Sequence, residues 1–134
     1  MTNAKRVQHT LNRTNSVECQ MILPREVVQY IAEQQIKDGE KAAGKGRGNL
    51  PTKADWVYLL LKEGYNLFMS GEVDCNLVAL PTEGSRAIRP RIENEFRALL
   101  EEAKPSFPVK FRGLVNFGPH LVLAAVKARK KAGK

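Results

Sequence analysis

The sequence predicts a mainly helical protein with short β-strands, in which one strand and two helices form an N-terminal domain and a smaller α+β region follows. Two observations predict this class: a short alternating segment over residues 17–23 ends at Pro24, and two amphipathic helical patterns follow it. We expect a flexible basic arm over residues 1–15, the strand–helix–helix domain over residues 16–70, and the α+β region over residues 71–134. One strand cannot form a stable sheet alone, so the pattern indicates a partner chain.

Composition limits the kind of partner and the location. The chain has 22 Lys and Arg against 14 Asp and Glu, a net charge of +8, and 43% hydrophobic residues. The positive excess favours a polyanion such as nucleic acid, with a plain basic surface and an acidic membrane or protein surface as alternatives. No signal peptide is recognisable, and no apolar run approaches the roughly 20 residues that span a bilayer. We therefore expect a cytoplasmic protein with no membrane partner.

The first strand and helix are predicted from residues 17–38. In the strand, alternate residues are expected to share a face: Val17, Cys19, Met21 and Leu23 inward, and Glu18, Gln20 and Ile22 outward. Pro24 suits the first position of a helix, where its missing N–H costs little. The apolar stripe of this helix predicts an end near Asp38–Gly39.

A basic, glycine-rich loop over residues 40–49 is expected to separate the two helices. The second helix opens with Thr52 and Asp55 in the spacing of a capping box. Its apolar face, from Trp56 to Phe68, is too wide for one neighbouring helix to cover.

The second half of the chain is predicted as two strands and two helices with no repeat of the first half. We expect strands over residues 73–80 and 109–117, a helix over 91–104, and a final helix over 119–131 that becomes basic at its end.

Catalytic, nucleotide and metal sites are not predicted. The segment from Gly39 to Gly46 matches a phosphate-binding loop up to its last position, where a hydroxyl for the metal ion is missing. His9 and His120 have no nucleophile or carboxylate pair in a recognisable spacing, and the two cysteines lack metal-ligand spacing. We expect no enzyme activity, no cofactor and no metal.

The segments VECQMILPREVVQYI and TKADWVYLLLKEGYNLF resemble the ribbon-helix-helix DNA-binding proteins of the Arc and MetJ type, over residues 17–68. The resemblance implies a homodimer whose two strands form an intermolecular antiparallel ribbon in the major groove of double-stranded DNA, with higher-order assembly on DNA a possibility. It implies that Glu18, Gln20 and Ile22 read bases. Phosphate contacts are expected from six residues of the arm, the loop and the helix starts: Arg13, Arg25, Lys45, Arg47, Thr52 and Lys53.

Two departures from the family stand beside this resemblance. The link between the helices is about ten residues longer than the family usually needs, and the outward face holds an acid and an apolar residue where bases and amides are more common. A strand register shifted by one residue and a helix-turn-helix variant both stay open.

The predicted function is sequence-specific binding of double-stranded DNA, as a transcriptional repressor or accessory factor of a plasmid or phage. The first alternative is an interaction protein that binds a host or partner protein through residues 71–134 without reading bases. The second is an RNA-binding module, which is weakened by an aromatic content of 7%.

Overall fold

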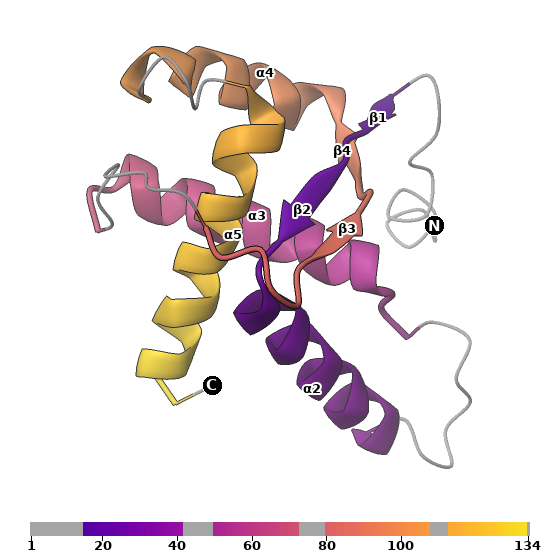
Figure 1. The fold of residues 1–134 in the computed structure, drawn as a ribbon. Helices are drawn as coiled ribbons and strands as arrows, with labels where there is room; N and C mark the ends of the chain where they lie inside the picture. The colour runs from indigo at the N-terminus through magenta and orange to yellow at the C-terminus, as the bar shows by residue number, and fades with distance from the viewer. Residues whose placement is uncertain (1–14, 42–49, 73–79, 108–112, 134) are drawn as a thin grey trace.

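The structure, a computed structural model, describes residues 15–41, 50–72, 80–107 and 113–133 (Figure 1). Four strands, four helices and one 3₁₀ turn follow one another in these residues. In chain order they are β1 (Ser16–Glu18), β2 (Met21–Leu23), α2 (Arg25–Lys41), α3 (Lys53–Met69), β3 (Arg86–Ile88), β4 (Arg91–Glu93), α4 (Asn94–Ala103), η1 (Lys104–Ser106) and α5 (Leu114–Lys131). The fold is therefore mainly helical with short strands, as the sequence predicts. None of the helices in the described residues is long and apolar enough to cross a membrane.

The four strands form two antiparallel pairs, and the two pairs follow one another as a single ribbon that is two strands wide. β1 pairs antiparallel with β4, and β2 pairs antiparallel with β3. Val17 lies opposite Ile92 and Ile22 lies opposite Ala87, so both pairs of strands share one register. Between them the Cys19 amide donates to the Pro90 carbonyl at 3.0 Å. Because proline has no N–H to return this bond, the ladder is interrupted at its middle although the two strands stay in step.

The partner strand corrects two expectations. The first is the intermolecular ribbon, because residues 16–23 pair in this structure with residues 86–93 of the same chain. The second is the helix expected from Arg91, which begins at Asn94 instead. Ile92 is fully buried on the inner side of the ribbon, so its segment follows the period of a strand.

The four helices are arranged around this ribbon. Because the strands are antiparallel, α2 and α4 leave the ribbon at opposite ends (Figure 1). α3 and α5 cross one another, and their mutual contact is the most extensive between any two elements. At the crossing a Cβ on Gly64 would lie 2.5 Å from the carbonyl carbon of Leu121, so only glycine permits this approach.

One hydrophobic core serves both parts of the chain. Phe107, which follows η1, stacks on Phe68 of α3 at 4.8 Å and on Phe117 of α5 at 4.5 Å between ring centroids. The same buried cluster includes inward residues of the ribbon. The wide apolar face of α3, which the sequence assigns to a partner, is covered by α5. The predicted boundary at residue 70 thus falls between two parts of one shared core.

The two parts repeat one strand–helix–helix plan. Leu23 and Ile92 are buried near the ends of the two strands, and a helix begins two residues after each, at Arg25 and at Asn94. The second helices, α3 and α5, bury residues at matching positions: Trp56 and Phe117, Val57 and Gly118, Tyr58 and Pro119, Leu60 and Leu121, Leu61 and Val122, Gly64 and Ala125. The two parts therefore repeat the order of their elements and the positions of their buried residues, although few residue types recur between them.

Two further boundaries differ from the prediction. α2 continues through Gly39 to Lys41, and its end is held by a 2.9 Å hydrogen bond from Trp56 Nε1 to Asp38 Oδ2. The strand predicted over residues 109–117 is wrong for 114–117, which form the first turn of α5. Phe117 is buried there and stacks on Phe107, and the buried residues Leu121 and Val122 follow it at helical spacing. The rest of that segment, and residues 73–79 of the other predicted strand, lie outside the described residues.

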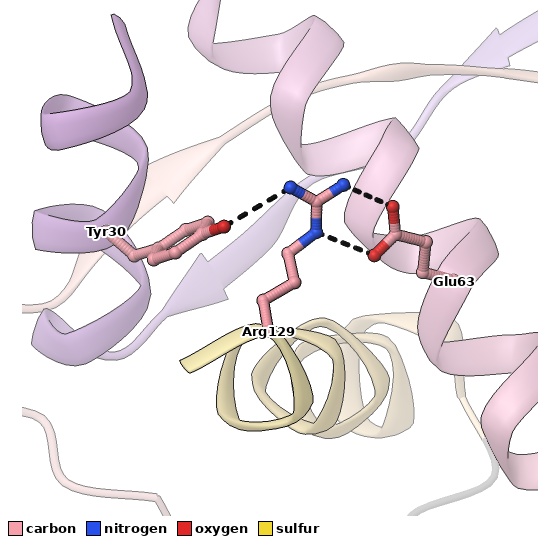
Figure 2. A network of polar contacts seen from close by, with 3 residues as sticks. All are labelled: Tyr30, Glu63 and Arg129. Atoms are coloured by element: carbon pink, nitrogen blue, oxygen red, sulfur yellow. Dashed lines mark hydrogen bonds and ion pairs between the residues drawn. The ribbon is translucent and has the colours of Figure 1, made fainter. Parts of the chain in front are cut away.

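A polar network joins three helices around Arg129 of α5 (Figure 2). Its Nε donates to Glu63 Oε1 at 2.8 Å, and a terminal amino group donates to the other carboxylate oxygen. The second amino group donates to the hydroxyl of Tyr30 in α2 at 3.2 Å. The hydrogen bond to Glu63 is the main cause of the raised pKa of Arg129. The C-terminal part of α5 is therefore fastened to both helices of the first repeat.

Candidate nucleic-acid interface

The outward face of the ribbon carries the predicted base-reading residues. Glu18, Gln20 and Ile22 are exposed, and the apolar Ile22 side chain is 55% accessible. Met21 and Leu23, which alternate with them, are fully buried. The strand therefore turns these three side chains to one accessible face, as its alternation predicts.

The inward set is less regular at the start of the strand. Val17, expected inside, is 38% exposed, while Ser16 is buried. Cys19 is half-buried, and this burial raises the pKa of its thiol, an effect that the nearby Arg97 guanidinium opposes. Along the first strand, the inner face is thus tightly packed only in β2, at Met21 and Leu23.

The partner strand adds three residues that sequence reasoning missed. Ala87 and Arg89 are exposed on the same face as Gln20, and Arg91 is half-buried beside them. A signal for this strand is present in the sequence, since Ile88, Pro90 and Ile92 alternate with these three residues. Two arginines therefore lie on a face for which the first strand supplies only an acid, an amide and an apolar side chain.

Gln20 and Arg89 meet at the centre of the ribbon. Arg89 Nε donates to Gln20 Oε1 at 3.0 Å. Each residue stands three positions before the buried residue near the end of its strand, Leu23 or Ile92, so the two are counterparts in the repeated plan. The bond uses one nitrogen of the guanidinium and leaves its terminal amino groups to donate outward.

The two ends of the outward face differ in chemistry. At one end Glu18 lies opposite Arg91, whose Nε donates to Ser16 Oγ at 2.9 Å and whose terminal amino group donates to the Ser16 carbonyl at 3.2 Å. At the other end Ile22 lies opposite the exposed Ala87. One end is charged and the other is apolar.

The predicted phosphate-binding start of α3 has the expected capping box. Thr52 Oγ1 accepts from the Asp55 amide at 3.1 Å, and Asp55 Oδ2 accepts from the Thr52 amide at 2.8 Å. Lys53 is exposed in the first turn. The carboxylate of Asp55 opposes an incoming anion at the same helix end, so Lys53 must supply the compensating charge.

The remaining predicted phosphate contacts are partly described. Arg25 is exposed at the start of α2, and its stem lies against the turn at Gly84, where a Cβ would come within 2.8 Å of Arg25 Cδ. Arg13, Lys45 and Arg47 lie outside the described residues. α5, the counterpart of α3, begins after Gly113 without a side-chain cap.

Chemistry of other kinds finds less support in the described residues. A pocket of about 410 Å³ opens between the C-terminal ends of α3 and α5, and its wall includes the Glu63–Arg129 ion pair that fastens these helices. Over the described ranges no group of three or more His, Cys, Asp or Glu side chains could hold a metal ion. Burial is the main cause of the raised pKa of Tyr58, whose hydroxyl donates to Glu93 at 2.9 Å and ties α3 to the end of β4.

No protein-family model, curated protein or solved structure matches this chain.

Proposed function

We propose that this chain is a sequence-specific double-stranded DNA-binding protein of the ribbon-helix-helix kind, in which one chain supplies both strand–helix–helix units. The observation that carries the proposal is the outward face of the ribbon. Six side chains from two strands stand on it, among them Gln20 and Arg89 at its centre. A two-stranded ribbon fits the major groove of B-DNA, where arginine pairs with guanine and glutamine with adenine.

The positive charge of the second strand offsets the negative charge that the first strand places on the outward face. Glu18 would repel the DNA backbone, but Arg91 lies opposite it and Arg89 lies two positions away along the partner strand. Arginine donors and a basic chain of net charge +8 favour approach to a polyanion. The face therefore combines attraction with groups that distinguish bases.

Phosphate contacts would come from the helix starts beside the ribbon. Lys53 at the start of α3 and Arg25 at the start of α2 are exposed and basic. Contacts of this type fix the position of a protein on the duplex without reading sequence.

A role as repressor or accessory factor of a plasmid or phage is part of the proposal, since it is common among ribbon-helix-helix proteins. The alternative, binding of a host or partner protein through residues 71–134, gains less support. β3, β4 and α5 of that region are built into the ribbon and the shared core.

The experiment is duplex binding by the full chain, measured by fluorescence anisotropy over a range of salt concentrations. If about five phosphates are neutralised, the logarithmic salt slope is about −4.5. Arg89→Ala should cost about 1–3 kcal/mol on a selected sequence and little on random DNA. Gln20→Ala should likewise relax sequence choice.

Lys53→Ala is the matched phosphate-contact variant. It should weaken selected and random duplexes alike and lower the salt slope by about one. Equal affinity of the unaltered chain for selected and random duplexes would contradict base reading. If only Lys53→Ala, and neither ribbon variant, removed the preference for the selected duplex, the bases would be read by another face than the ribbon.

A further inference from the structure

The two halves of the ribbon ladder are matched in position but not in side chain. In the repeated plan Glu18 corresponds to Ala87 and Ile22 corresponds to Arg91, since each stands at the same distance before Leu23 or Ile92. In a symmetric dimer both ends of the ribbon would carry the same pair of side chains. Here one end carries Glu18 with Arg91, and the other carries Ile22 with Ala87.

From this difference we infer that one chain binds one non-palindromic DNA site, with a G·C pair under the Glu18–Arg91 end of the ribbon and a T·A pair under the Ile22–Ala87 end. The inference rests on the proposed function and deepens it by stating the form of the site. A second copy of the chain is not needed, because both strands and both crossing helices belong to one chain.

The charged end suits a G·C pair. A carboxylate accepts from the N4 amino group of cytosine, and arginine donates to O6 and N7 of guanine. Arg91 uses Nε and one amino group on Ser16, which holds its positive charge beside Glu18. That charge allows an exposed carboxylate to approach the DNA at this end.

The apolar end suits a T·A pair. Ile22 is 55% exposed although it is a large apolar side chain, and the opposite residue is an exposed alanine. The thymine C5 methyl group is the apolar feature of the major groove, and contact with it removes both surfaces from water. No hydrogen-bonding side chain competes for that base at these two positions.

The test is selection from random duplexes with the full chain, followed by the mass of the complex in solution. The inference predicts an asymmetric motif bound by one chain. A palindromic motif bound by two chains overturns the inference and leaves base reading standing. Duplex binding without any enriched motif, or no duplex binding at all, overturns both the inference and the proposed function.

A symmetrised variant tests the assignment of the two ends. Glu18→Ala with Arg91→Ile gives both ends the apolar pair, so the selected site should carry T·A at each end, while its centre under Gln20 and Arg89 stays asymmetric. If this variant does not fold by circular dichroism, Glu18→Ala alone must remove the G·C preference at one end only. An unchanged motif in the folded variant overturns the assignment.

The apolar end has a separate chemical test. Replacing its thymine by uracil removes only the methyl group, and affinity should fall about four-fold, the equivalent of one buried methyl group. With Ile22→Ser the same replacement should have no effect. Equal sensitivity of the two proteins to uracil overturns the assignment of Ile22.

Discussion

The first strand–helix–helix unit, residues 16–69, and the second, residues 86–131, match in their buried positions but differ in the side chains on their outward face. Their helices α3 and α5 bury matching positions and cross where Gly64 meets Leu121. Their outward strand residues differ at every matched position: Glu18 and Ala87, Gln20 and Arg89, Ile22 and Arg91. Core positions must satisfy packing in both units, whereas each outward position is free to match a different part of a ligand. The comparison separates the residues that hold the fold from those that recognise a partner.

A substitution that disturbs the packing of α3 on α5 at their crossing should have the largest effect on stability. Gly64→Ala places a methyl group against the Leu121 carbonyl, and we expect a loss of about 3 kcal/mol in the free energy of unfolding. The normal gain from alanine in a helix, about 1 kcal/mol, is outweighed. Chemical denaturation measures the change, with Asn66→Ala on the exposed side of α3 as the control. Unchanged stability of Gly64→Ala would mean that the helices cross elsewhere.

Releasing the second unit from the first should cost less. Arg129→Met leaves Glu63 and the Tyr30 hydroxyl without their common donor, and we expect a loss of about 1–2 kcal/mol. Lys130→Met is the matched control, because its 3.4 Å contact with Glu26 is more exposed and should contribute less than about 0.5 kcal/mol. Equal losses of unfolding free energy in the two variants would show that Arg129 does not stabilise the contact between the two units.

The two helix starts give a contrast in charge. α3 begins with the Asp55 carboxylate in its capping box, and α5 begins without a side-chain cap. Asp55→Asn keeps an acceptor for the Thr52 amide and removes the negative charge, so duplex affinity at low salt should rise about two- to five-fold. Glu33→Gln, an exposed change in α2 of the same charge, serves as the control. A rise of similar size in both would indicate net charge alone.

The smallest expected effect is a pH dependence of the free energy of unfolding that arises from a histidine in α5 and has no counterpart at the matching position of α3. His120 of α5 takes the position of Leu59 in α3, and burial lowers its pKa from the ordinary value of 6.5. Between the lower folded pKa and 6.5 the unfolded chain binds more protons, so the free energy of unfolding falls as pH falls through this window. Denaturation at pH 7.5 and 5.5 should show this fall, and His120→Gln should reduce it. An identical fall in the variant would assign the titration to another group.

Local patterns could be predicted from the sequence, and the pairing of the units could not. The alternation around Gln20 and the capping box of Thr52 and Asp55 depend on neighbours in the chain, and both predictions are confirmed. The second strand is short and contains Pro90, and the helical pattern after it extends backward to Arg91, so a helix was the expected structure.

The repeat itself was hidden for a physical reason. Burial recurs between α3 and α5, but a buried position accepts tryptophan in one helix and phenylalanine in the other, or tyrosine in one and proline in the other. A comparison of residue types therefore finds no repeat. Without it, the uncovered face of α3 and the single strand pointed to a second chain.

The most direct test of the central claim is a disulfide across the ribbon. Ile22→Cys with Ala87→Cys, in a chain with Cys19→Ser and Cys75→Ser, places two thiols at directly opposite outward positions. Ile22→Cys with Ile88→Cys is the control, because these positions face opposite sides of the ribbon. On oxidation the first pair should give a crosslinked product with the mass of one chain. A crosslinked product with the mass of two chains would contradict a ribbon formed within one chain.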